Sequence, residues 1–224
     1  MIFKREVKMM NNSISGVSVP SDLPSSQRKD EMAEQLIQQR PVIQRAVSSV
    51  PYSDIRASVK DPLDLIDELL SRYLDQQTVR AKTMADTIET WSNAIAEINR
   101  IWGLVMQDNM NHTNPNDNNT RTPLGDSVSG KHLEDIDRII REELKDDRGI
   151  AAITGLDLAA SKTHRVSYTD LQSLNATMTA YCDTIQVDID TEQQKFKNVM
   201  TEITSAQEEI RDVRRVIVTL SQGG

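Results

Sequence analysis

Residues 169–220 read TDLQSLNATMTAYCDTIQVDIDTEQQKFKNVMTEITSAQEEIRDVRRVIVTL, and this stretch decides the fold. Its apolar residues recur in alternating steps of three and four, which is typical of the seam of a coiled-coil helix. The first part of the seam consists of Leu171, Leu174, Met178, Tyr181 and Ile185. The second part consists of Phe196, Val199, Ile203, Ala206, Ile210, Val213, Ile217 and Leu220. The pattern predicts one helix of about 50 residues, opened by a capping box of the form T-x-x-Q at Thr169 and Gln172.

The two parts of this seam are separated by a largely polar interval, a step of 11 positions from Ile185 to Phe196. A step of 11 divides into four, three and four, so it places two successive steps of four in the pattern. Such an insertion is a stutter, which locally unwinds a coiled coil. The interval therefore does not end the helix.

A second long helix is predicted over residues 62–106. Asp61 is suited to accept a hydrogen bond as the N-cap, and Pro62 suits the first helical position because its missing N–H costs nothing there. The seam of this helix includes Ile88, Trp91, Ile95, Ile98 and Trp102. Two helices of this length bury their seams against each other, either antiparallel or parallel. The fold class predicted is all-α, with two long helices forming a coiled-coil hairpin, short helices and a small irregular segment between them, and a disordered N-terminus.

The remaining segments divide the chain as follows. Residues 1–27 are rich in serine and lack any apolar period, which predicts disorder. Residues 28–60 are expected to form a short helix, ended or kinked at Pro41, and a connection. Residues 61–224 form the hairpin domain, with a flexible Asn-rich loop at 107–130 and a small helical and irregular insert at 131–168.

Within this insert, residues 131–147 are predicted to form an amphipathic helix that Gly149 stops. The following apolar segment suits a short turn or a small β-element around Ile153–Leu156.

Composition excludes several classes of function. The chain has 224 residues with 26 Lys and Arg against 34 Asp and Glu, a net charge of −8. Nucleic-acid binding needs an excess of cations, so no nucleic acid is expected as partner. No apolar run reaches the ~18 residues of a membrane-spanning helix, and the N-terminus lacks the apolar stretch of a secretory signal peptide.

No arrangement of residues indicates catalysis or a cofactor. Cys182 is the only cysteine, and no histidine is placed to activate it, so we interpret it as a small buried apolar residue. The acidic clusters lack the alternating spacing of a metal loop, and no metal is expected. Trp91 and Trp102 suit either a ligand pocket or, more commonly, a helix core. The chain is therefore predicted not to be an enzyme and to bind no cofactor.

A run of arginines near the C-terminus, Arg211, Arg214 and Arg215, has two interpretations. It suits phosphate binding, or it complements the negative end of the helix dipole, and the second interpretation is favoured.

Two short motifs carry a resemblance. The turn Ile153-Thr154-Gly155-Leu156-Asp157 is followed by a helix start at Asp170-Leu171-Gln172-Ser173-Leu174-Asn175-Ala176. In order and layout, residues 62–224 resemble the type III secretion translocator-filament proteins, the EspA/SseB group. The needle-tip proteins of the same systems also end in a long coiled-coil helix, but they usually carry a larger insertion than 107–168 here. This N-terminus is longer than that of the family, and its first helix is less hydrophobic.

The resemblance implies a subunit exported through the type III pathway to the bacterial surface or the extracellular space. There it would self-assemble through coiled-coil packing into a filament or tip. The implied partners are further copies of the chain, the secretion needle, translocator pore proteins and a dedicated cytosolic chaperone. The Ser-rich start is similar to an uncleaved export signal. The alternative hypothesis is an intracellular coiled-coil adaptor or chaperone-like binding protein without enzymatic activity.

Overall fold

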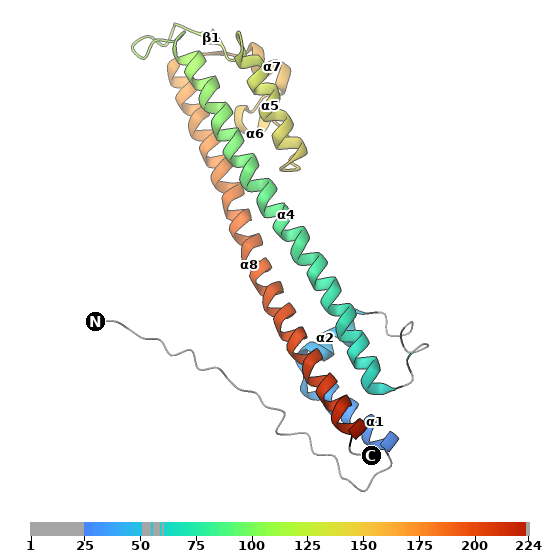
Figure 1. The fold of residues 1–224 in the computed structure, drawn as a ribbon. Coiled ribbons are helices and arrows are strands. Elements are labelled where there is room, and N and C mark those ends of the chain that lie inside the picture. Colours follow the sequence, from blue (N-terminus) through green and yellow to red (C-terminus); the bar gives the residue numbers. More distant parts are fainter. Residues whose placement is uncertain (1–24, 51–54, 56–58, 60, 223–224) are drawn as a thin grey trace, which may run out of the picture. The chain divides into compact units, whose positions relative to one another are not determined.

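The structure is a computed structural model that describes residues 25–50, 55, 59 and 61–222. These residues form seven helices and two short strands (Figure 1). The helices are α1 (Ser25–Gln39), α2 (Pro41–Ser49), α4 (Pro62–Met110), α5 (Ser129–Glu142), α6 (Ala151–Thr154), α7 (Leu158–Thr163) and α8 (Tyr168–Gln222). The strands β1 (Thr122–Pro123) and β2 (Arg165–Val166) pair antiparallel. The all-α class is as predicted. None of the helices in these residues is apolar over enough of its length to cross a membrane.

The chain folds into two compact units, and each unit contains a part of α4 and a part of α8. The first unit consists of Met1–Arg80 and Asn198–Gly224, and the second consists of Ala81–Lys197. The first unit therefore combines α1, α2, the beginning of α4 and the end of α8. The second combines the rest of α4 and α8 with the short elements between them.

The core of the first unit joins four helices. In it α4 and α8 run antiparallel, because Arg214 pairs with Asp67 whereas Tyr73 donates a hydrogen bond to Glu202. The buried apolar residues are Met32, Ala33, Leu36, Val42, Ile43, Ala46, Val50, Ile55, Leu63, Leu65, Ile66, Leu69, Leu70, Tyr73, Ala206, Ile210 and Val213. The long helices are thus covered by α1 and α2 in this unit.

The beginnings of the N-terminal helices follow from local chemistry. Pro41 divides the predicted helical segment into α1 and α2, and it occupies the first turn of α2, where no N–H is needed. The sequence placed residues up to 27 in the disordered segment, but Ser25–Gln39 is helical. Polar residues are compatible with the first turn, which precedes the first buried residue, Met32. Residues 1–24 of the predicted disordered segment lie outside the described residues.

The start of α4 is as predicted. The Asp61 carboxylate accepts a hydrogen bond from the backbone N–H of Leu63 at 3.0 Å, and Pro62 is the first helical residue. Lys29 of α1 also pairs with this carboxylate. The partner on α1 lowers the pKa of Asp61 against the opposing effect of burial. The cap thereby links α1 to the start of α4.

The start of α8 differs from the prediction. The helix begins at Tyr168, and the reciprocal cap joins Ser167 and Asp170 instead of Thr169 and Gln172. The Asp170 carboxylate accepts from the backbone N–H of Ser167 at 2.9 Å, and the Ser167 hydroxyl accepts from the N–H of Asp170 at 3.3 Å. Both sequences have the form of a capping box, but Ser167 and Val166 are buried, which fixes the earlier start.

The insert between the long helices is mostly helical, and its β-structure lies at its ends instead of at the apolar turn. The segment expected to hold a short turn or a small β-element forms the one-turn helix α6, which ends at Gly155 in the left-handed conformation (φ 72°), so the turn alternative is the nearer one. The predicted helix 131–147 is instead α5, Ser129–Glu142. Gly149 lies in the following turn with φ 58°, where a Cβ would overlap the Asp137 carboxylate. The only strands in the described part of the chain, β1 and β2, close this insert.

The segment predicted as a flexible loop, 107–130, contains the end of α4, β1 and the start of α5. Its anchor is Asn109, a buried residue of α4. The Asn109 amide donates to the carbonyls of Val105 and Leu124 at 2.9 and 3.1 Å and to the Ser129 hydroxyl at 3.3 Å. The Asn109 side chain therefore connects α4 to the segment around Leu124 and to the start of α5. These contacts fix where the chain returns to the core after the turns at 111–121.

Candidate functional site

The predicted seam in the second unit lies in an internal core. Ile98 and Trp102 of α4 are buried with Leu171, Met178 and Tyr181 of α8. Trp91, Ile95, Leu174 and Ile185 are partly buried and pack against this core, whereas Ile88 and Phe196 are partly buried outside it. The Trp102 indole donates to the Asn175 side chain at 3.2 Å. This packing supports the core interpretation of Trp91 and Trp102.

The predicted seam in the first unit is covered in the same way. Val199, Ile203, Ala206, Ile210 and Val213 are buried, whereas Ile217 and Leu220 are partly buried. Ala206, Ile210 and Val213 belong to the core that α1, α2 and α4 complete. The stripe that the sequence offered for contacts between subunits is therefore occupied by the chain's own helices.

Some core residues were not named as part of the seam. Ala94 and Ile101 of α4 are buried in the core that also contains Leu133 and Ile136 of α5. They lie beside the seam because α4 contacts more than one neighbour here. Ile189, 1% exposed, occupies the polar interval of α8 four residues after Ile185. The division of that interval into four, three and four pointed to this position.

In the first unit, carboxylates of α8 form ion pairs with Arg45 of α2 and with Arg40, the residue before α2. Glu202 accepts from Arg45 at 3.3 Å and from the Tyr73 hydroxyl at 3.2 Å. Asp212 lies 3.8 Å from Arg40, the residue between α1 and α2. The pairs are partly exposed, so each contributes on the order of 1 kcal/mol or less. Together they fix the position of α2 along α8.

Glu209 of α8 is a buried carboxyl group at the contact between α8 and α2. It is 9% exposed, and its Oε2 has no hydrogen-bond partner in the described residues. Burial raises the pKa of Glu209, while Arg40, Arg45 and the backbone N–H of Ile43 act in the opposite direction and Asp212 acts in the same direction as burial. Ile43 lies in the first turn of α2, so the buried Glu209 carboxylate of α8 faces the start of that helix.

The single cysteine is enclosed in the second core. Burial raises the pKa of the Cys182 thiol to about 11, and Asp183 adds to the shift. Its sulfur lies 3.7 Å from the Met178 sulfur. A thiol that stays protonated at neutral pH is a poor nucleophile. The neighbouring Tyr181 donates to Asp146 at 3.2 Å, and the Arg148 guanidinium lies 6.0 Å from the tyrosine ring.

The arginine run lines a surface groove on α8. Arg214 forms two hydrogen bonds with Asp67 at 2.8 and 3.2 Å, and Arg215 lies 3.6 Å from Asp212. Arg211 is exposed and makes no ion pair within the part of the chain that the structure describes. The groove, of about 660 Å³, is lined by Gln207, Ile210, Arg211, Arg214, Arg215, Val218 and Thr219. The interpretation of these arginines as partners of the helix dipole does not hold, because α8 continues to Gln222 and has no basic residue in its last turn. The groove had no signal in the sequence.

The described residues contain no group of three or more His, Cys, Asp or Glu side chains arranged to hold a metal ion. No family model, no curated protein and no solved structure matches the chain. The functional argument therefore depends on the residues themselves.

Proposed function

We propose that the chain is a secreted structural subunit of a type III secretion apparatus. It self-assembles through coiled-coil packing into the extracellular filament or tip that supports effector translocation. In this proposal α4 and α8 form the coiled-coil hairpin of the subunit. The needle, the translocator pore proteins and a cytosolic secretion chaperone are its further partners.

The observation that carries the proposal is the structural role of the two motifs behind the family resemblance. In the first motif, Gly155 ends α6 in the left-handed conformation, and the Asp157 carboxylate caps α7 by accepting from the N–H of Ala160 at 2.8 Å. In the second motif, Asp170 makes the reciprocal cap with Ser167 at the start of α8. Periodic apolar residues are common to all coiled coils, whereas these capping residues depend on one particular local path of the chain.

The length and layout of the helices support the same proposal. α4 has 49 residues and α8 has 55, so each extends over ~70–80 Å at 1.5 Å per residue. Long paired helices provide extended surfaces for repeated contacts between subunits. The buried thiol and the absence of a second cysteine in the sequence suit a chain that is exported without disulfides.

Export is tested in a bacterium that carries a type III secretion system. We expect the full-length chain in the culture supernatant of the parent strain and its loss from the supernatant when the secretion ATPase is deleted. A cytosolic enzyme assayed in the same supernatant controls for lysis. Deletion of residues 1–24 should keep the protein inside the cell with unchanged helical circular dichroism. Retention of the full-length chain in the cytosol of both strains contradicts the proposal and favours the adaptor function.

A further inference from the structure

Charge is distributed unequally between the two units. The first unit carries 14 Lys and Arg against 15 Asp and Glu, a net charge of −1, and the second carries 12 against 19, a net charge of −7. Most of the net charge of the chain therefore lies in the second unit. A cationic surface on the first unit of one copy is therefore complementary in charge to the acidic second unit of another copy.

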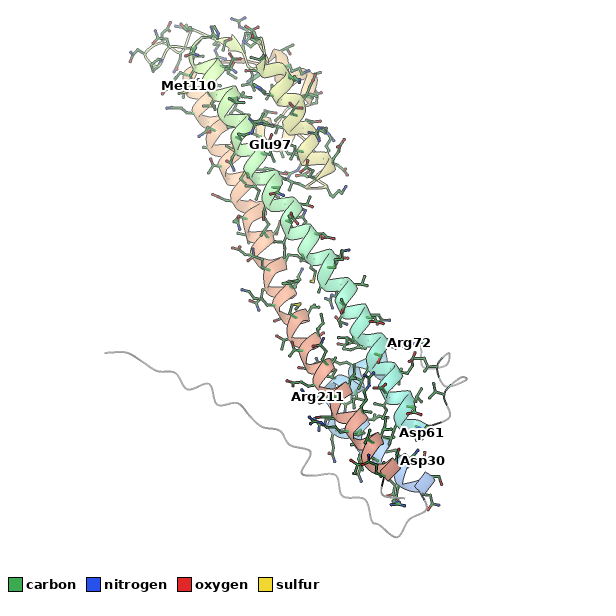
Figure 2. The ribbon with its side chains drawn as sticks, viewed as in Figure 1. Asp30, Asp61, Arg72, Glu97, Met110 and Arg211 are labelled. Carbon is green, nitrogen blue, oxygen red and sulfur yellow. The ribbon has the colours of Figure 1, made fainter. Side chains whose placement is uncertain are left out.

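The groove on α8 is such a cationic surface. Arg211, Arg215 and Val218 follow one another at steps of four and three, so they share one face of the helix. Val218 is 52% exposed, and Arg211 is labelled on α8 in Figure 2. The groove thus combines arginines with the exposed apolar side chain of Val218, which suits an amphipathic helix whose charges are negative.

A matching face occurs on α8 within the second unit. Asp183, Val187 and Asp190 stand at steps of four and three and share one side of the helix. Val187 is 64% exposed, and both aspartates are exposed. The stretch 183–194 contains four acidic residues and no basic one. An apolar side chain flanked by two carboxylates complements a groove that presents arginines beside an exposed valine.

We propose that the groove binds the Asp183–Val187–Asp190 face of a second copy of this chain. The inference rests on the proposed function, because it names the contact through which the subunits would assemble. The N-terminal segment of the chain is a poorer match for the groove. Residues 1–24 contain three basic and two acidic residues, a net charge of +1, and so do not complement arginines.

The geometry of the contact follows from its chemistry. The two surfaces are different patches of the same chain, so the contact is heterologous. A bound copy leaves its own groove free and presents it to the next copy. Such contacts produce open polymers unless the rotation between copies closes a ring. Val213 takes no part in this contact, because the chain's own helices cover it, and Ile210 is largely buried in the same core and only borders the groove.

The test uses sedimentation velocity of the full chain over a range of concentrations. We expect the wild-type chain to form species larger than a dimer. A groove variant, Arg211→Glu, and a face variant, Asp183→Ala with Asp190→Ala, should each require at least roughly tenfold higher concentration to associate. Equal mixing of the two variants should restore association, but only to dimers, since each mixed pair retains one intact groove and one intact face.

The matched control is Lys131→Glu, which changes the net charge as Arg211→Glu does but lies at an exposed position of α5. It should associate as the wild type does. Circular dichroism confirms that each variant retains its helix content. The inference is overturned if the wild-type chain stays monomeric. It is also overturned if either variant associates as strongly as the wild type, or if the mixture of the two variants stays monomeric. These results are independent of the export assay, so a failure of the contact is distinguishable from a failure of the proposed function.

Discussion

Replacing Glu209 by glutamine should stabilise the first unit at neutral pH. The Glu209 side chain is buried on α8, its Oε2 has no hydrogen-bond partner in the described residues, and burial raises its pKa above the ordinary value of 4.5. The folded state therefore binds a proton at Glu209 more readily than the unfolded state does. The contribution of this group to stability is fully present below the ordinary pKa and is lost as the pH rises through the folded pKa.

Glutamine keeps the shape of the side chain and a polar oxygen near the start of α2, and it removes the buried charge. An uncompensated buried polar or charged group typically costs on the order of 1 kcal/mol or more, so we expect a gain of about 1 kcal/mol at neutral pH. For a chain of this size such a gain raises Tm by roughly 2–4 °C. The gain should be smaller at pH about 4.5, because the raised pKa means that wild-type Glu209 carries less charge in the folded state as the pH falls.

The assay is thermal unfolding followed by circular dichroism at pH about 7.5 and about 4.5. The control is Glu208→Gln at the neighbouring exposed position, which should leave Tm unchanged at both pH values. A lower Tm for Glu209→Gln at neutral pH would refute the reasoning. It would mean that attraction from Arg40 and Arg45 outweighs the cost of burying the carboxylate.

Three further predictions follow from buried or capping residues. Ser167→Ala and Asp170→Ala should each destabilise the second unit by about 1 kcal/mol and be strongly non-additive in a double-mutant cycle of urea unfolding, since each completes the other's hydrogen bond; additive losses would contradict the reciprocal cap. Cys182→Ser should leave export and assembly intact, and the wild-type thiol should react with iodoacetamide only in denaturant, as mass spectrometry can measure. Ile210→Asp should cost at least a few kcal/mol in thermal unfolding because it places a charge in the core, whereas Glu208→Lys nearby should be nearly silent; equal Tm values for Ile210→Asp and wild type would show that the site is not enclosed.

Local chemistry made the long helices predictable. The Asp61–Pro62 start of α4 and the apolar stripe of α8 are encoded within a few residues of each position, so sequence reading located them closely. The same local signals were ambiguous at the start of α8, where two capping boxes overlap and begin only two residues apart, at Ser167 and at Thr169. The burial of Ser167, a property of the packed unit, decided between them.

The short elements and the candidate assembly surface could not be predicted in the same way. Asn109 looks like one more residue of an Asn-rich loop, and only its contacts with Leu124 and Ser129 reveal its buried role. The covering of Ile210 by α1 and α2 likewise depends on segments far away in the sequence. The groove at Arg211 and Val218 emerged once the structure showed which side of α8 the other helices leave uncovered.

The discontinuous first unit imposes an order of events on the newly made chain. Glu202, which pairs with Arg45, is synthesised 157 residues after it. At ~5–20 residues per second a ribosome needs roughly 8–30 s to cover that interval. During this time the apolar residues of α1, α2 and the start of α4 have emerged without the α8 residues that complete their core. The second unit, by contrast, has all its residues before the last part of α8 is made. The N-terminal region is therefore the first part of the chain to leave the ribosome and the last to be enclosed.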